Sequence, residues 1–421
     1  MPSRPRRMVW FAAACAASRL VCAQQQTDWS EAQTVERFLS LSPQARELRG
    51  RVALAEAEAR RRTVYPNPSV SYSREGAGYN QFFEASQTLP FSRRVRYLRD
   101  AGAAAVSVAD TNREAVLWSL RSDLRLAFYQ MIAAQERVRV LSSGASEVER
   151  LAVILRQREQ EGEGSRYDRL RAEREIAELR TDVIAANALI ASARGRIGGF
   201  LPENTKVETA RGSLATEIIA PGLEALQARA MEARADYRAE QKTLARFALE
   251  EQAARRLRIP EPLVSGGVKR ADVTSASPSG FNSTTRTGVI FGISIPLQVF
   301  NDGRYEVARY QAEQEQAKAR TAVIARQIQS EVEGAYGVLA TRRQALAAYQ
   351  AAVGSEGAEL TRITRAAYDE GEVGILELLD SLRVTRVASL RLLDLQAGVR
   401  EALIELERVL GFELTSGEVR P

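Results

Sequence analysis

Histidine is absent from this chain of 421 residues. Histidine is the commonest general base and metal ligand in proteins, so its absence argues against hydrolytic triads and most zinc sites. No segment matches a phosphate-binding loop or a dinucleotide-binding fingerprint. The residue types present therefore indicate a protein that is not an enzyme, with no cofactor and no bound metal.

Cysteine is nearly absent as well, since the only two are Cys15 and Cys22. Both follow a basic start and lie within or after an apolar run over residues 8–17, which is too short to cross a bilayer as a helix. We expect residues 1–23 to be a secretory signal peptide, which leaves a mature chain without disulfides. The alternative is a lipoprotein acylated on Cys22, although Arg19 stands where a lipobox normally has leucine.

A strong charge imbalance and long apolar runs are also lacking. The formal charge of +6 falls to +2 once the four arginines of residues 1–23 are removed, because that segment has no acidic residue. A mixed surface of this kind does not favour nucleic acid as a partner. No later run of 18 apolar residues predicts a transmembrane helix. Such an exported chain is periplasmic, secreted or an outer-membrane barrel.

Proline is missing from two long stretches, residues 91–201 and 297–420. Both stretches are rich in strong helix formers, and proline disrupts helix interiors, so very long helices are predicted, the first over about residues 92–161. Apolar residues recur there at helical spacing and form narrow seams. The seams comprise Leu117, Leu120, Leu124, Phe128, Met131, Val138 and Leu141, and then Ile324, Ile328, Val332, Tyr336, Leu339, Leu346 and Val353.

Two strands are predicted before each long helix, over residues 69–73, 81–89, 263–268 and 288–295. An apolar face alternates there with a small or polar face, which is typical of membrane barrel strands and also of a soluble hairpin with one buried face. Four strands cannot close a membrane barrel, because the smallest use about eight. Open sheet edges are not tolerated in lipid, so several chains must share one barrel if these strands span a membrane.

Aromatic residues gather around these strands. An aromatic girdle at the membrane surface explains them, and packing inside a soluble sheet explains them equally well. The residues are Tyr65, Tyr72, Tyr79, Phe82, Phe83, Phe91, Phe281, Phe291 and Phe300.

The chain repeats itself at an offset of 206 to 209 residues. Residues 89–91, 122–128 and 161–163 align with residues 295–297, 330–336 and 370–372. Near-constant offsets indicate a duplicated unit. We therefore divide the chain into a signal peptide (1–23), a first repeat of helix, two barrel strands, long helix and helix (24–201), an equatorial linker (202–220), a second such repeat (221–411) and a C-terminal tail (412–421).

Four motifs combine with this duplication. They are the strand entry at Tyr65-Pro66-Asn67-Pro68, the segment Ser86-Gln87-Thr88-Leu89-Pro90, and two turns over residues 162–168 and 368–380. In this order and spacing they resemble the TolC family of outer-membrane efflux proteins, over about residues 29–411. The strand followed by arginines is most similar to the CzcC-like heavy-metal branch.

This resemblance implies a mainly α protein with a small β part. It implies a homotrimer in the outer membrane, with a 12-stranded β-barrel to which each protomer gives four strands, on an α-helical barrel of duplicated hairpins that extends into the periplasm. The chain would be a passive exit duct of a tripartite efflux or export system, with a periplasmic adaptor (membrane fusion protein) and an inner-membrane pump as partners and outer-membrane lipid around it. Metal ions, drugs and secreted proteins all stay open as cargo. The alternatives, a periplasmic adaptor or a coiled-coil scaffold, leave the second hairpin or the paired strands unexplained.

Glycines interrupt the helical pattern at corresponding places in both repeats. Gly162 and Gly164 do so in the first repeat, and Gly371 and Gly374 in the second. Glycine permits the positive φ of a helix reversal. By resemblance these are the periplasmic tips where the adaptor docks; a helix kink or a loop without a partner is the other interpretation.

Three carboxylates follow the tips: Asp168, Glu377 and Asp380. Glu377 and Asp380 share one helix face, and in a threefold assembly each becomes a ring of like charges that favours cations. By resemblance they form the pore gate. Val373 stands where the family often has the basic partner, so Arg166 or Arg383 is a possible substitute. The alternative is a solvated helix face.

Overall fold

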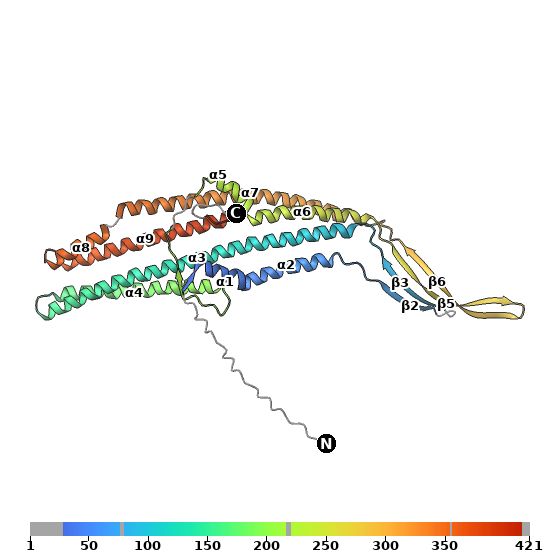
Figure 1. The fold of residues 1–421 in the computed structure, drawn as a ribbon, viewed down its shortest axis with the longest axis horizontal. Helices are drawn as coiled ribbons and strands as arrows, with labels where there is room; N and C mark the ends of the chain where they lie inside the picture. The colour runs from blue at the N-terminus through green and yellow to red at the C-terminus, as the bar shows by residue number, and fades with distance from the viewer. Residues whose placement is uncertain (1–27, 76–79, 216–219, 354–355, 415–421) are drawn as a thin grey trace, which may run out of the picture.

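The structure, a computed structural model, describes residues 28–75, 80–215, 220–353 and 356–414. The predicted signal peptide, with Cys15 and Cys22, lies outside the described residues. The molecule is elongated, with a long helical body that carries a narrow curved sheet at one end and two helical hairpins at the other (Figure 1). None of the described helices is long and apolar enough to cross a membrane.

The first half of the chain places two helices before its strands where the sequence predicts one. Ser42 separates them, since its side chain accepts a hydrogen bond from Ala45 N and Pro43 begins the next helix. The order is α1 (Glu31–Leu41), α2 (Pro43–Arg61), β2 (Ser69–Glu75), β3 (Asn80–Thr88), α3 (Arg94–Gln160) and α4 (Arg166–Gly198).

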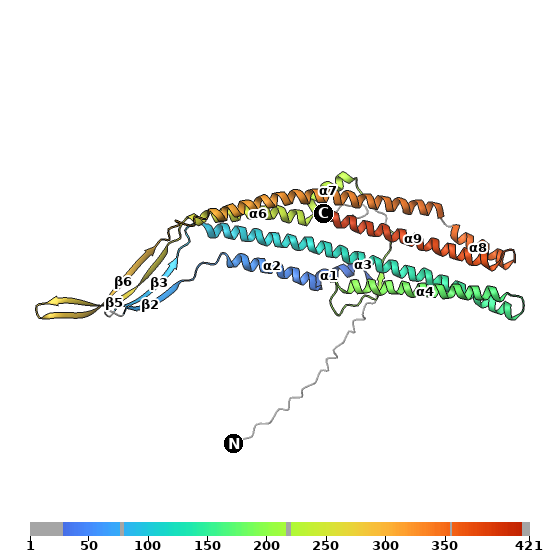
Figure 2. The same cartoon turned by 180° about the vertical axis from the view of Figure 1, so that it is seen from behind.

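The second half follows the same order with more interruptions. It comprises α5 (Leu223–Ala233), α6 (Ala235–Arg255), the short 3-10 helix η1 (Arg256–Arg258), β5 (Leu263–Ser277), β6 (Gly280–Ser294), α7 (Arg304–Val353), α8 (Glu356–Asp369) and α9 (Ile375–Leu410). The second long helical stretch is thus divided into α7 and α8 rather than continuous. Figure 2 shows the α3–α4 hairpin running beside the α8–α9 hairpin along the body.

Helix α3 has 67 residues, which makes it about 100 Å long at about 1.5 Å per residue. The predicted seams form buried contacts: Leu124, Phe128 and Met131 of α3 are buried against α1, α4 and α9, and Ile328 and Val332 of α7 are buried against α5 and α9. A third buried cluster runs toward the hairpin tips between α3, α4 and α9. The prediction of a mainly α protein with a small β part is confirmed.

The four predicted strands form one antiparallel sheet in the order β2-β3-β5-β6. Its register aligns apolar residues across the sheet, as in the row Tyr72, Phe83, Val268 and Val289, all of which are exposed. The row Ser69, Ser86, Ser265 and Gly292 lies on the other face. The sheet therefore has one apolar and one small or polar face, and β2 and β6 are edges without a strand partner in the described part of the chain.

A second, two-stranded sheet was not predicted. β1 (Asp28–Ser30) pairs in parallel with β4 (Thr209–Arg211), which lies inside the predicted linker. The side chains of Thr209 and Arg211 donate to the Asp28 carboxylate. This contact ties the linker to the first described residues of the chain.

Candidate functional site

The two hairpin tips have the same backbone geometry. Gly162 and Gly371 have φ of +81° and +76°, a region that favours glycine. In the first tip Gly162 N donates to Glu159 O and Glu163 N donates to Arg158 O; the second tip repeats both bonds at the corresponding residues. This pair of bonds is the Schellman motif that ends a helix. The tips therefore end α3 and α8 and reverse the chain into α4 and α9.

The other two tip glycines have different roles. A Cβ on Gly164 would lie 2.9 Å from both Arg158 Cβ and Glu159 N, so the returning chain passes too close to α3 for a side chain. Gly374 is the N-cap of α9 with φ −83°, and the Glu377 carboxylate lies over it, 3.0 Å from where a Cβ would stand. That carboxylate thus lies at the positive end of the α9 dipole.

The structure places the three candidate gate carboxylates near the tips. Asp168 lies in the first turn of α4 and is half-buried. Glu377 and Asp380 lie on α9 and are exposed, whereas Leu378 and Leu379 between them are buried. The apolar face of α9 thus packs inward, and the two carboxylates are available to solvent or to a neighbouring subunit.

Tyr368 is a tip residue that the sequence did not single out. It packs against the buried cluster beneath the tips, and the Arg158 guanidinium lies 5.7 Å from its ring centre. Burial raises the pKa of the Tyr368 hydroxyl, as does the negative charge of Asp168, while Arg158 opposes the shift. Tyr368 and Arg158 are therefore in contact where the two hairpins touch, and Asp168 acts on the Tyr368 hydroxyl through its charge.

This contact bears on the basic partner expected at the gate. Arg158, at the end of α3, contacts Tyr368 and not a gate carboxylate, so Arg166 or Arg383 as the basic partner of the gate stays a prediction. Both of those arginines are exposed. Arg158 precedes the tip glycine and lies on another helix from Tyr368, so no sequence spacing indicates the contact.

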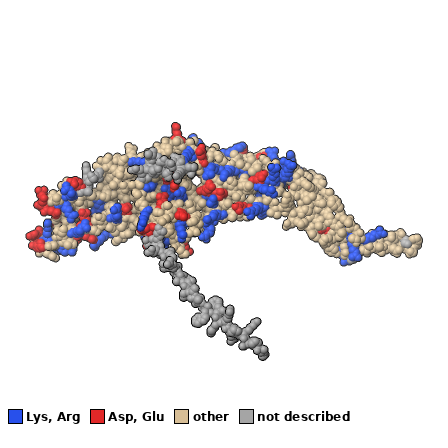
Figure 3. Space-filling view, in the orientation of Figure 1, with Lys and Arg blue, Asp and Glu red and all other residues tan. Residues whose placement is uncertain are grey.

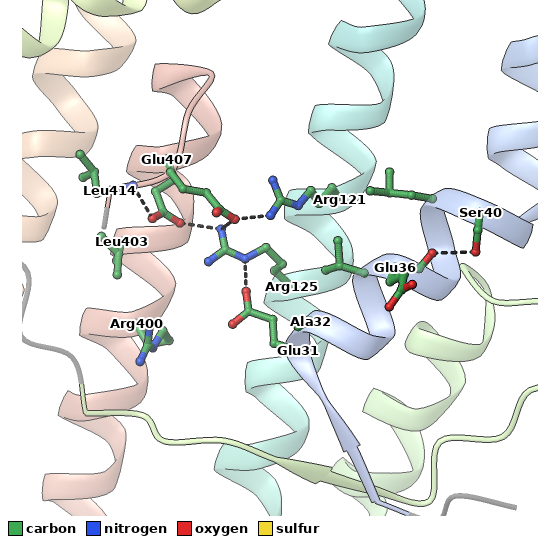
Figure 4. A pocket seen from close by; sticks show the side chains of 13 residues that line it. Glu31, Ala32, Glu36, Ser40, Arg121, Arg125, Arg400, Leu403, Glu407 and Leu414 are labelled. Atoms are coloured by element: carbon green, nitrogen blue, oxygen red, sulfur yellow. Dashed lines mark hydrogen bonds and ion pairs between the residues drawn. The ribbon is translucent and has the colours of Figure 1, made fainter. Parts of the chain in front are cut away.

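A buried ionic cluster lies midway along the body, where α1, α3 and α9 meet (Figure 4). Arg125 donates to Glu31 and to Glu407, with 2.5 Å between Arg125 Nη1 and Glu407 Oε2. The Arg125 and Glu407 side chains are 7% and 3% exposed. Tyr129 adds a hydrogen bond of 2.5 Å to Glu31. The cluster fixes the start of the chain, the long helix and the last helix to one another.

The environment of this cluster shifts its pKa values in opposite directions. Burial raises the pKa of Glu407 and outweighs the Arg125 charge. Burial also acts to raise the pKa of Glu31, but Arg125 and the bond from Tyr129 outweigh it, so that pKa is lowered. Burial and the bond to Glu31 raise the pKa of Tyr129 to about 12, which keeps its hydroxyl protonated as a donor.

Charge is nearly absent from the sheet end of the molecule. Between the arginines that flank it, residues 63–73 and 287–301 hold no charged side chain. Residues 80–92 and 259–268 hold one each, Glu84 and Glu261. Figure 3 shows this band as an almost uncharged surface between the charged helical body and a group of basic side chains farther out along the sheet.

The aromatic residues near the strands are mostly exposed on the single chain. Tyr65, Tyr72, Phe91, Phe291 and Phe300 are between 59% and 93% exposed. Packing inside a soluble sheet, one of the two interpretations, does not account for them. Tyr79 lies outside the described residues.

No group of three or more residues able to hold a metal ion occurs in the described ranges.

No protein-family model matches the chain. The chain is 25% identical over 332 residues to the cobalt-zinc-cadmium resistance protein CzcC of Cupriavidus metallidurans, covering 73% of each chain.

Solved structures resemble the chain along nearly its whole length. The open-state MtrE outer-membrane channel of Neisseria gonorrhoeae matches with a TM-score of 0.69 and 20% identity, over 92% of this chain and 91% of that one. The CmeC outer-membrane channel of Campylobacter jejuni matches with a TM-score of 0.69 and 12% identity, over 92% and 87%. The resemblance indicated by the sequence is thus confirmed: this chain has the fold of the TolC family of outer-membrane channels and is related in sequence to CzcC.

Proposed function

We propose that the chain is the outer-membrane subunit of a tripartite efflux system, and that three copies form a passive exit duct across the outer membrane and the periplasm. The β2-β3-β5-β6 sheet would give four of twelve barrel strands, and the helices would form the periplasmic tube. The proposal needs no catalytic group, because a pump in the inner membrane would supply the energy.

The two-faced sheet is the observation that carries this proposal. Its exposed apolar rows, such as Tyr72, Phe83, Val268 and Val289, suit lipid, and its serine and glycine rows suit a water-filled lumen. A lone four-stranded sheet would leave the β2 and β6 edges unpaired in lipid, where each unpaired backbone group costs several kcal/mol. The edges therefore require partners from other copies of the chain.

The direction of the strands permits this closure. Each neighbouring pair in the sheet is antiparallel, and four is an even number, so β2 and β6 run in opposite directions. β6 of one protomer can then pair antiparallel with β2 of the next, and the ring closes without a parallel junction. The similarity to MtrE and CmeC, which are outer-membrane channels, supports the same arrangement.

We propose that the tips at Gly162, Gly164, Gly371 and Gly374 dock a periplasmic adaptor. They lie at the end of the body opposite the sheet, about where a duct of this length would meet an inner-membrane assembly (Figure 1). The duplicated Schellman turns give each protomer two similar tips. For cargo we propose small molecules or metal ions, and the relationship to a cobalt-zinc-cadmium resistance protein favours divalent cations.

Cross-linking between the sheet edges tests the assembly. Cysteine pairs with one thiol on β2 and one on β6, on the same face of the sheet, are tested over several registers, because strands in a barrel are staggered; Ser71→Cys with Ile290→Cys is one such pair. A bifunctional thiol reagent should join them between chains and give dimers and trimers on a denaturing gel. The matched control, Ser86→Cys with Ser265→Cys, joins residues that face each other within one chain and should give monomers only.

The same preparation tests location and activity. The protein should be recovered from the outer-membrane fraction and should form ion-conducting channels in planar bilayers. Deletion of its gene from the source bacterium should increase sensitivity to divalent metals if those are the cargo. Recovery from the cytosol, or a β2–β6 pair that links only within a chain, would contradict the proposed function.

A further inference from the structure

A collar of arginines surrounds the junction between the helical body and the sheet. It consists of residues 60–62 at the end of α2, 93–99 at the start of α3, and 255–258 at the end of α6 and in η1. These three segments contain ten arginines and no acidic residue. Figure 3 shows them as a blue cluster where the body gives way to the uncharged sheet.

Packing contacts hold the three segments together. A Cβ on Gly102 in α3 would lie 2.9 Å from Ala59 Cβ in α2, so these helices are in close contact just below the collar. The Arg256 guanidinium lies 5.5 Å from the ring centre of Tyr97, which joins η1 to α3. The collar is therefore one surface built from distant parts of the chain.

Seven of the ten collar arginines have no ion-pair partner in the described part of the chain, since only three pair with carboxylates. Arg62 pairs with Glu250, Arg60 with Glu56 and Arg255 with Glu251. In the described part of the chain no ion pair involves the exposed arginines Arg61, Arg93, Arg96, Arg99 and Arg258. The Nε of Arg94 is buried without a hydrogen-bond partner. Elsewhere on the body more than half of the arginines pair with carboxylates, as Arg113, Arg137 and Arg180 do, so the collar has an unusual share of guanidinium groups available to an external anion.

Exposed apolar side chains adjoin the collar on its sheet side. Phe91, Leu297 and Phe300 are 68%, 79% and 93% exposed, and they lie between the strands and the first turns of α3 and α7. Rings at the membrane surface with basic side chains just outside it are the usual arrangement at a lipid headgroup layer. Guanidinium groups also bind phosphate oxygens in a bidentate manner.

We propose that this arginine collar binds the phosphate groups of anionic phospholipids in the membrane leaflet that faces the helical body. The inference rests on the proposed function, because it requires the sheet to span the membrane. It adds a preference for one class of lipid and the depth at which the protein sits in the membrane. The collar would hold the junction at the level of the headgroups, while the uncharged band lies in the hydrocarbon.

Lipid competition on the purified full-length protein tests this proposal. The protein in detergent is offered phosphatidylglycerol and phosphatidylcholine in equal amounts, and bound lipids are counted by native mass spectrometry. The wild type should retain phosphatidylglycerol preferentially, and added salt should weaken the preference. The quadruple variant replaces Arg61, Arg96, Arg99 and Arg258 with glutamine. Its ratio of bound phosphatidylglycerol to bound phosphatidylcholine should be lower than that of the wild type by a factor of about ten or more.

A matched variant controls for net charge. Arg37, Arg46, Arg150 and Arg391 are also exposed and without an ion pair in the described residues, but they lie away from the junction on α1, the start of α2, the far part of α3, and α9. Replacing these four with glutamine should leave the lipid preference unchanged. Inorganic phosphate at the same concentration should not displace the lipid, because the acyl chains of the lipid also contact the exposed apolar side chains beside the collar, which a free anion cannot do.

The outcomes separate this proposal from the proposed function. Equal loss of preference in both variants, no preference in the wild type, or displacement by inorganic phosphate would overturn the lipid collar. If both variants still form conducting channels in phosphatidylcholine bilayers, the channel function stands in each of these cases. A wild type that forms no channel in any bilayer would contradict the function itself.

Discussion

Ion pairs around the buried Arg125 hold three helices together at the middle of the helical body. Arg125 on α3 faces Glu31 from α1 and Glu407 from α9, so it joins three elements at one point. Removing one partner from such a cluster leaves an uncompensated buried charge, which costs far more than loss of an exposed pair. The exposed pair Arg51–Glu47, at 2.7 Å, gives the comparison.

Arg125→Met should therefore destabilise the protein by about 3–5 kcal/mol, because the buried Glu407 and the half-buried Glu31 lose their cation. Arg51→Met should change stability by less than about 1 kcal/mol, since its side chain is 66% exposed. Thermal unfolding of the purified protein in detergent measures both. Adding Glu407→Gln to Arg125→Met should recover part of the loss; no recovery would mean that the cost comes from packing rather than charge.

Acid should weaken the same cluster through Glu31. Its pKa is lowered below the unfolded value of 4.5, so its contribution to stability is present above that value and is lost as the pH falls through the folded value. The raised pKa of Glu407 gives the opposite slope. Glu31→Gln should thus reduce the fall in melting temperature between about pH 5 and about pH 3 relative to the wild type. Glu58→Gln, an exposed carboxylate in α2, serves as control and should not alter that fall.

The tip turns depend on one backbone conformation each. Gly371→Val should strain its tip by about 1–3 kcal/mol, because a β-branched residue resists the φ of +76°. Insertion and assembly should be retained, since the sheet lies at the other end of the body, while efflux and adaptor cross-linking should fall. Gly50→Val, at an exposed helical position with open space around it, is the control. Normal adaptor cross-linking by Gly371→Val would show that this tip does not dock the adaptor.

At the scale of the elements, the pairing of β3 with β5 depends on close backbone contact. A Cβ on Gly267 would lie 2.2 Å from the Phe83 carbonyl oxygen, whereas one on the adjacent Gly266 would meet nothing within 4 Å. The two glycines therefore give a matched test of the sheet, one residue apart and on opposite faces.

Gly267→Ala should push β5 away from β3. Most of the wild-type yield of inserted protein should then be lost. Gly266→Ala should insert normally. The yield of folded protein in the outer-membrane fraction measures both variants. Equal yields would mean that the strands can shift enough to accept the methyl group, and the register at Phe83 would then be less constrained than the contact indicates.

The sequence predicted the elements that have a strong periodicity and missed those that do not. Helix α3 and the four sheet strands follow from proline gaps and apolar alternation. β1 and β4 have three residues each, which is too short for a period to show, and their pairing depends on contacts between distant segments such as Asp28 and Arg211. The break before α6 falls at Arg234, which bonds Asp236 and Glu331. No turn residue marks that break in the sequence.

At the scale of the whole molecule, the tips and the candidate gate were predictable only in part. The tip glycines stand out because they interrupt two long helical patterns at matching positions. Tyr368 and Arg158 do not stand out, because their contact joins α8 to the end of α3, far apart in the chain. Whether Glu377 and Asp380 face a pore depends on three chains together, so it stays a prediction.

The gate prediction concerns charge around the axis of the trimer. If Glu377 and Asp380 face the pore, three copies of each place up to six carboxylates around one constriction, and these attract cations. Glu377→Gln with Asp380→Asn should then lower cation-over-anion selectivity and weaken block by divalent or trivalent cations applied from the periplasmic side. Stability should change little, since both side chains are exposed before mutation.

Single-channel recordings in planar bilayers measure both properties. The control, Glu47→Gln with Glu56→Gln, removes the same charge on α2, which lies on the sheet side of the body away from the tips (Figure 1), where the duct is not expected to be constricted. A charge affects selectivity strongly only where the bore approaches the Debye length of about 10 Å at 0.1 M salt, so the control should conduct like the wild type. If the tip variant also keeps wild-type selectivity and cation block, then Glu377 and Asp380 lie on an outer, solvated face of α9 and do not form the gate.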